Sequence, residues 1–133
     1  MSITTNFYPS FPVSDFERSL VFYDIVMATF RVPRWNEIEA QGRREAEYGL
    51  DEDLKMLSIL ESPDYSSGTT QIFSSSVSFR AENQSAVDAF FTTAIANGAT
   101  ELEKPGFRED DSYTTSVKDL DGHEIGAYWP NSN

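Results

Sequence analysis

The amino-acid sequence predicts a mixed α/β (α+β) fold built from two similar units within one domain, residues 1–133. The chain is long enough for one packed core, and 39% of its residues are hydrophobic, with ten Phe and six Tyr among them. Each half contains a strand-like segment followed by a helical pattern, and this order recurs at a spacing of about 65 residues. We therefore expect two modules, at approximately residues 1–62 and 70–133.

The first module is expected to open with a strand and a helix. Residues 3–13 are rich in β-branched and aromatic side chains, and their two prolines place this strand at a sheet edge or a bulge. Ser14, with Glu17 three residues later, forms a capping box, and apolar residues follow at helical spacing. This pattern predicts a helix over about residues 15–27.

The rest of the first module has a less regular pattern. Residues 29–32 form a short strand candidate, and residues 35–48 are charged and ambiguous, with a hairpin tip at 42–44. Residues 54–60 are a nearly continuous apolar run, typical of a strand. The turn-rich segment 61–68 then divides the chain near its midpoint.

The second module repeats the order of strand and helix. Residues 72–80 predict a strand, and residues 84–97 place apolar side chains on one helical face before Gly98 ends the helix. Three further strands are expected at residues 99–103, 113–118 and 124–129. A tight turn joins the last two.

Composition limits the partners and the compartment. Lys and Arg total 10 against 22 Asp and Glu, so the net charge of −12 repels nucleic acid and anionic membranes. The absence of cysteine removes disulfides and zinc–thiolate sites. The N-terminal residues show no signal-peptide pattern, and no apolar run approaches the roughly 20 residues of a membrane span. We expect a cytoplasmic protein that binds neither nucleic acid nor membrane.

Several segments resemble the glyoxalase, bleomycin-resistance and extradiol-dioxygenase superfamily, also called the vicinal oxygen chelate fold. They are Phe-Arg-Ala-Glu-Asn at residues 79–83, the helical run after it, residues 13–23, and Val-Lys-Asp-Leu-Asp-Gly-His-Glu-Ile at 117–125. The resemblance implies two βαβββ modules that form a curved, cup-like sheet. The concave face of this sheet binds a small molecule in the superfamily, frequently with a divalent metal.

The resemblance also shows where metal ligands would be expected. Those positions hold Tyr8, Ser76 and Gly126, and the run 54–60 contains neither Asp nor Glu. The whole chain has a single histidine, so a site with two histidines cannot be assembled. We therefore predict no metal, no cofactor and no family-type catalytic residue. Lactoylglutathione lyase and iron-dependent ring-cleaving activities are disfavoured by the same argument.

Residues that share strand parity with these positions are expected to line the cup and bind the ligand. They are Tyr8, Ser10, Ser76, Ser78 and Tyr128. Tyr113 is a further ligand-binding candidate at the rim, together with Trp35 and Tyr48. Hydroxyls and aromatic faces suit a neutral or aromatic small molecule. An equally weighted alternative is that Tyr8 fills the space of the missing metal and donates a hydrogen bond to Ser76.

Three other features have an ordinary structural explanation that we favour. His123 could act in proton transfer, but its place after a turn glycine favours a surface position. Arg80 could bind a carboxylate, but an ion pair with Glu82 is favoured. The acidic run 109–111 lacks the spacing of a calcium loop and predicts a solvated turn.

Three functions remain open at this stage. The first is a metal-free binding protein, a homodimer that sequesters an aromatic or cationic compound. The second is an enzyme with a rearranged site, a lactoylglutathione-lyase-like lyase, an isomerase or a dioxygenase-type member that uses Tyr8, Glu124 or His123. The third is a structural dimer without a ligand, favoured if the hydroxyls of the cup satisfy one another.

Overall fold

The computed structural model describes residues 8–40, 42–62 and 75–130, and it confirms two βαβββ modules. The first module consists of β1 (Ser10–Val13), α1 (Phe16–Ala28), β2 (Arg34–Ala40), β3 (Arg43–Gly49) and β4 (Lys55–Glu61). The second consists of β5 (Ser76–Arg80), α2 (Gln84–Ala96), β6 (Thr100–Phe107), β7 (Tyr113–Lys118) and β8 (Glu124–Trp129). The module order predicted from the sequence is therefore correct.

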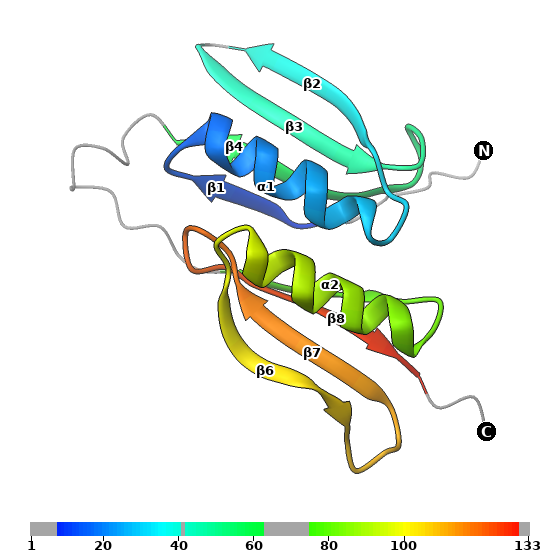
Figure 1. Cartoon of the computed structure of the whole chain (residues 1–133). Coiled ribbons are helices and arrows are strands. Elements are labelled where there is room, and N and C mark those ends of the chain that lie inside the picture. Colours follow the sequence, from blue (N-terminus) through cyan, green and yellow to red (C-terminus); the bar gives the residue numbers. More distant parts are fainter. Residues whose placement is uncertain (1–7, 41, 63–74, 131–133) are drawn as a thin grey trace.

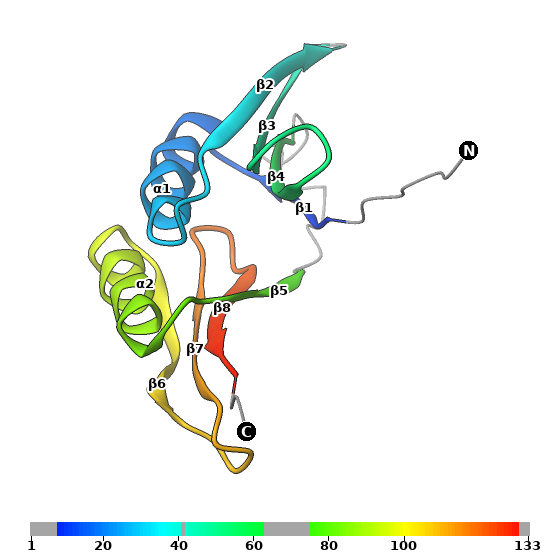
Figure 2. The same ribbon diagram turned by 90° about the vertical axis from the view of Figure 1, so that its right-hand side faces the viewer.

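Each module forms one four-stranded mixed sheet. The strand orders are β1-β4-β3-β2 and β5-β8-β7-β6, with β1 parallel to β4, β5 parallel to β8, and the other pairs antiparallel. The two modules stack on each other (Figure 1), and both helices cover the same side of the sheets, on the left in Figure 2. We call the opposite, helix-free side of the two sheets the cup face.

Side-chain caps set the start of both helices. Asp15, rather than Ser14, caps α1 by accepting a hydrogen bond from the Arg18 N–H at 3.2 Å, so the predicted capping box is wrong by one residue. The Ser14 N–H instead donates to Asp121 of the second module at 3.2 Å. Asn83 caps α2 in the same way as Asp15 caps α1, with 2.8 Å to the Ala86 N–H.

The strand predictions for the first module need two corrections. Residues 29–32 do not form a strand, because the N–H groups of Phe30 and Val32 donate to the Met27 carbonyl and close the end of α1. The ambiguous region contains two paired strands instead, β2 and β3. Ala40 pairs with Arg43, so of the predicted hairpin tip 42–44 only Gly42 lies between the strands. Residues 3–7, 63–68 and 72–74 of the predicted strands and loop lie outside the described residues.

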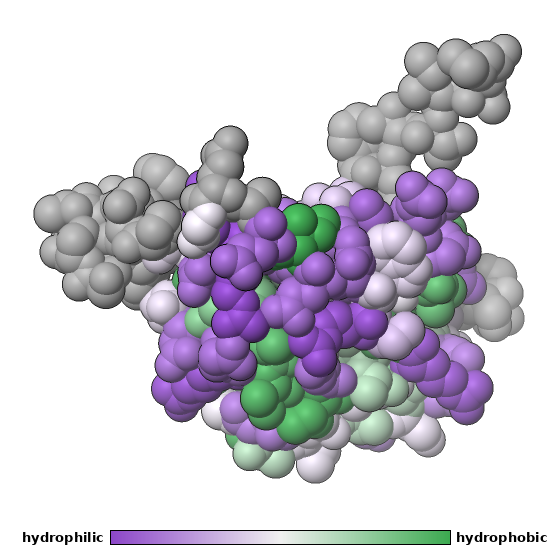
Figure 3. All heavy atoms as spheres, turned by 90° about the horizontal axis from the view of Figure 1, so that it is seen from above, coloured by the Kyte–Doolittle hydropathy of each residue, from purple (hydrophilic) through white to green (hydrophobic). Residues whose placement is uncertain are grey.

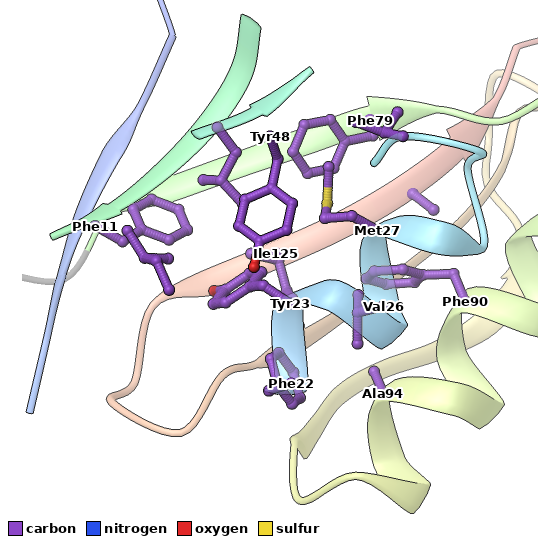
Figure 4. Packing of buried hydrophobic residues seen from close by; sticks show 14 of the residues in the cluster. Phe11, Phe22, Tyr23, Val26, Met27, Tyr48, Phe79, Phe90, Ala94 and Ile125 are labelled. Atoms are coloured by element: carbon purple, nitrogen blue, oxygen red, sulfur yellow. The ribbon is translucent and has the colours of Figure 1, made fainter. Parts of the chain in front are cut away.

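The hydrophobic core joins both modules. Figure 4 shows Tyr23, Val26 and Met27 of α1 packed among residues from the sheets and from α2. Phe30 links the halves directly, because its ring lies 5.5 Å from that of Phe79 and 5.2 Å from that of Phe90. Burying a large apolar side chain contributes about 1.5–3 kcal/mol. The modules are thus held together by the same packing that holds each of them.

His123 lies at the junction of the modules, fully buried, so the predicted surface position is wrong. Its ring stacks on that of Phe11 at 4.5 Å. Nδ1 accepts a hydrogen bond from the Ser75 N–H at 3.1 Å, and Nε2 lies 2.8 Å from the Pro12 carbonyl oxygen. Because Nδ1 accepts, Nε2 carries the proton and donates to Pro12. The imidazole connects β1 to the second module.

Candidate functional site

Strand register places polar side chains of both sheets on the cup face. In the first sheet Ser10 of β1 lies opposite Ser58 of β4, and in the second Ser78 of β5 lies opposite Gly126 of β8. The alternate residues, such as Phe11 and Ile59, point to the helices and are fully buried. The cup face therefore carries polar side chains from both sheets, while the alternate residues of the same strands are apolar and pack under the helices.

A buried carboxylate stands at the centre of the first sheet. Glu47 of β3 lies between Ala46 and Tyr48, which pack toward α1, so its own side chain points to the cup face, where it is only 3% exposed. It accepts hydrogen bonds from the Tyr8 hydroxyl at 3.1 Å, the Asn36 amide at 3.2 Å and the Lys55 ammonium at 2.9 Å. These partners replace the water that a buried carboxylate loses.

The partners also keep this carboxylate ionised. Burial by itself would raise the pKa of Glu47, but the hydrogen bonds from Lys55, Asn36 and Tyr8 outweigh it and hold that pKa below its ordinary value. Burial and the neighbouring carboxylate raise the pKa of Tyr8, and the hydrogen bond to Glu47 raises the pKa of Lys55. At neutral pH the cluster therefore holds a carboxylate, a phenol and an ammonium group.

Two aromatic rings flank the ammonium group. Lys55 Nζ lies 5.8 Å from the centre of the Tyr8 ring and 5.7 Å from that of Trp35, within the range of cation–π attraction. Trp35 reaches this place because the pairing of β2 with β3 shifts register between Arg34 and Asn36. A bulge of this kind re-aims a side chain. We call Tyr8, Trp35, Glu47 and Lys55 the lysine box.

The other predicted ligand-binding residues of the cup lie where parity places them. The Ser58 hydroxyl donates to the Ser10 hydroxyl at 2.9 Å. The Ser76 hydroxyl donates to Glu124 at 3.2 Å, so the alternative in which Tyr8 bonds to Ser76 is wrong. Ser78 is exposed and Tyr128 half-buried on the second sheet. The structure thus forms two polar groups, one on each sheet, and β1 and β5 lie on the side away from the two helices (Figure 2).

Two of the rim candidates face the helices instead. Tyr113 is 8% exposed, and its hydroxyl donates to Asp88 of α2 at 2.6 Å. Tyr48 is fully buried and donates to Asp24 of α1 at 2.8 Å. The predicted positions of Tyr113 and Tyr48 at the rim are therefore wrong, since each strand turns alternate residues away from the cup. Trp35, the third candidate, lies in the lysine box.

The residues present do not fit the metal site that the superfamily resemblance implies. A Cβ atom added at Gly126 would lie 2.8 Å from the Thr115 carbonyl oxygen, so no ligand side chain is accommodated at that position. Tyr8 and Ser76 offer neutral hydroxyls, and the single histidine is used at the module junction. Across residues 8–40, 42–62 and 75–130, no group of three His, Cys, Asp or Glu side chains is placed to hold a metal ion.

Of two surface features predicted from the sequence, the partner of Glu82 is wrong and the turn at 109–111 is correct. Glu82 lies 4.0 Å from Arg31, which takes the place predicted for Arg80 in this ion pair. The acidic run 109–111 forms the predicted turn between β6 and β7, where Asp110 accepts a hydrogen bond from the Ser112 N–H at 3.0 Å. No helix in the described part of the chain is long and apolar enough to cross a membrane.

Two stacked βαβββ modules, with both helices on one side and polar side chains on the helix-free side, have the vicinal oxygen chelate fold, as the sequence resemblance predicted. A glyoxalase/bleomycin resistance protein from Albidiferax ferrireducens T118 matches with a TM-score of 0.73 and 26% identity, over 93% of this chain and 97% of that one. A glyoxylase/bleomycin resistance protein/dioxygenase domain from Frankia sp. EAN1pec has a TM-score of 0.73 and 16% identity, over 98% and 100% of the two chains.

A third similar solved structure is named for a resistance function. The fosfomycin resistance protein FosX from Mesorhizobium loti matches with a TM-score of 0.64 and 18% identity, over 98% of this chain and 96% of that one. No family model and no curated protein sequence matches the chain. The likeness therefore establishes the fold, while the function has to be argued from the side chains of the cup.

Sequence reasoning missed Glu47 and Lys55. The signal was present in residues 45–48, where charged residues alternate with Ala46 and Tyr48 in the period of a strand. That alternation assigns Glu47 to the face opposite α1. The contact with Lys55 was not accessible in this way, because it depends on the pairing of β3 with β4.

Proposed function

We propose that this protein binds a small molecule in its cup without a family-type metal site. The observation that supports it is the buried, ionised Glu47 on the cup face, beside two aromatic rings and an amide. Small-molecule sites typically combine aromatic walls with a few polar groups that orient the ligand. The exposed hydroxyls of Ser10, Ser76 and Ser78 add hydrogen-bonding capacity on the same face.

Three observations bear on the choice between binding and the alternative functions. His123 is buried and both of its ring nitrogens are engaged, so an enzyme with a rearranged site would have to rely on groups such as Tyr8 and Glu124. The hydroxyls of Ser58 and Ser76 donate to neighbouring side chains, which also suits a structural protein without a ligand. Glu47 favours binding, because a buried ion pair is rarely the most stable solution for a purely structural sheet face.

Capture of an aromatic or cationic compound is the most specific form of this proposal. The net charge of −12 attracts cations, and Tyr8, Trp35 and Tyr128 provide aromatic faces.

A cytoplasmic location and a homodimer belong to the same proposal. Large apolar side chains such as Val21 and Phe107, each 59% exposed, are available for contact between two copies. On the face seen in Figure 3, hydrophobic residues form small groups within a mostly hydrophilic surface.

A ligand screen with a matched pair of variants tests the proposal. Ligand-observed NMR against aromatic and cationic compounds is compared between the native protein and Ser78→Trp, which fills the cup beside Gly126. Ser85→Trp makes the same change on the exposed side of α2 and serves as the control. Compounds that bind the native protein and S85W but not S78W support binding in the cup. Binding that is retained both in S78W and in Glu47→Gln, or no binding at all, would contradict it.

Two further measurements test the remaining parts. Light scattering after size exclusion gives the mass of the assembly, and a monomer at all concentrations excludes the homodimer. Metal content of the native protein, with a thermal-shift titration of Mn, Fe, Co, Ni and Zn, tests the absence of a metal. A stoichiometric ion, or stabilisation that grows with free ion, would require the lyase or dioxygenase alternative to be taken up again.

A further inference from the structure

We propose that Glu47, Tyr8 and Trp35 form a binding site for the ammonium group of a ligand, which Lys55 occupies as a displaceable internal substitute. This inference rests on the proposed function and names the chemical class of ligand, a small organic amine. A carboxylate with two aromatic walls is the chemistry that recognises an alkylammonium ion. In the lysine box, the protein's own ammonium group fills that role.

The fixed and the movable parts of the box differ clearly. Glu47 lies inside β3 between two paired strands, and Asn36 and Tyr8 continue to donate to its two oxygens when the ammonium group leaves. Lys55 is the first residue of β4, directly after the turn at Asp51–Leu54, and its ammonium is carried by a flexible four-carbon chain. Its side chain is 22% exposed, whereas that of Glu47 is 3% exposed. Lys55 can therefore swing out while the carboxylate stays in place.

The charges around the box favour replacement by another cation. Glu45 lies two residues before Glu47 on the same face of β3, and its carboxylate acts on the Tyr8 hydroxyl. Glu52, in the turn before Lys55, attracts the same ammonium group that Glu47 binds. A displaced Lys55 thus finds another carboxylate nearby, and the strongly negative chain concentrates cations at its surface.

The test removes the internal ammonium and supplies an external one. Lys55→Ala deletes three carbons and the ammonium group, which propylammonium replaces in size and charge. We expect the melting temperature of K55A to rise with propylammonium concentration to saturation, as binding to the folded state requires. The native protein should need an at least about tenfold higher concentration, because Lys55 occupies the site most of the time. Propanol and sodium chloride at matched concentrations control for shape and ionic strength.

Further variants of the lysine box test whether the rise in melting temperature comes from binding at Glu47. Adding Glu47→Gln to K55A should abolish it, and adding Trp35→Ala should weaken it several-fold. Adding Glu109→Gln, which removes one exposed carboxylate from the turn between β6 and β7, should leave it unchanged. An unresponsive K55A, an equal response to propanol, or a response that survives E47Q would overturn the inference.

If K55A does not fold, the Lys55 Nζ signal of the native protein is followed by NMR instead. Displacement by propylammonium supports the site, and an unchanged signal overturns it.

The outcomes separate this inference from the proposed function. Ligands that bind the native protein, are lost in S78W and carry no amine, together with an unresponsive K55A, would refute the ammonium site and leave binding in the cup standing. A screen without any ligand, together with an unresponsive K55A, would refute both.

Discussion

The hydroxyl of Tyr23 in α1 donates a hydrogen bond to Oδ2 of Asp119, at the start of the turn between β7 and β8. Both residues are buried, with 1% and 5% exposure. The other carboxylate oxygen, Oδ1, accepts the N–H groups of Asp121 at 2.9 Å and His123 at 2.8 Å. One module thus completes the hydrogen bonding of a turn in the other, and this turn carries the histidine that bonds back to β1.

Removal of this hydroxyl should weaken the whole domain. Tyr23→Phe leaves the buried Asp119 carboxylate one partner short, so we expect a loss of about 1–3 kcal/mol in the free energy of unfolding, measured by urea denaturation. Tyr113→Phe is the matched control, because its partner Asp88 is exposed and water can replace the hydroxyl. Equal losses in the two variants would contradict a special role for the bond between the modules.

The carboxylate of the lysine box should make stability depend on acidity. The folded-state pKa of Glu47 lies below the ordinary value of 4.5, so its ionised form stabilises the folded state above pH 4.5. This contribution is lost as the pH falls through the folded-state pKa. We expect Glu47→Gln to lower the free energy of unfolding by about 1–3 kcal/mol at pH 7.

Denaturation across a pH series checks this expectation. The difference between the native protein and E47Q should shrink as the pH is lowered from 7 toward 3. Glu45→Gln, two residues away on β3, should show a much smaller difference at every pH. A difference that stays constant down to pH 3 would mean that the charge of Glu47 contributes nothing to folding.

His123 should exist as one tautomer. The Ser75 N–H donates to Nδ1 and the Pro12 carbonyl lies at Nε2, so the neutral form protonated at Nε2 is expected. Long-range ¹H–¹⁵N NMR distinguishes the two nitrogens directly. A spectrum with a proton on Nδ1 at neutral pH would contradict the placement of the ring.

Replacing this histidine tests how much its contacts contribute to the free energy of unfolding. His123→Ala removes the stacking on Phe11 and both hydrogen bonds of a fully buried ring. We expect a loss of about 2–5 kcal/mol in the free energy of unfolding. A loss below 1 kcal/mol would be the result expected of a surface side chain.

Gly126 should resist any side chain, including a metal ligand. A Cβ atom there approaches the Thr115 backbone, so Gly126→Ala is expected to cost about 1–3 kcal/mol, and Gly126→Asp should destabilise the protein without creating metal binding. Gly106→Ala is the control, because its nearest obstacle is the flexible end of the Arg108 side chain at 3.4 Å. Thermal melting of the three variants, with and without added divalent metal, measures the effect.

Local sequence pattern predicted most of the elements correctly. Apolar side chains at helical spacing located both helices, and alternation located β7 and β8 to the residue, since these patterns follow from the geometry of a single segment. Residues 29–32 were assigned wrongly because their β-branched and aromatic composition suits a strand. In the structure their N–H groups close α1 instead, a competition that composition does not reveal.

The sequence by itself determined the two modules and the parity of Tyr8, Ser10, Ser76, Ser78 and Tyr128, because each depends on residue type and on spacing within one strand or helix. It also shows which residues, Tyr8, Ser76 and Gly126, stand where the superfamily resemblance implies metal ligands. Only the tertiary structure decided which charged groups meet. Glu47 and Lys55 come together through strand pairing, and His123 is buried because the second module packs against β1. Contacts between distant segments depend on the register and docking of whole elements, which no local pattern records.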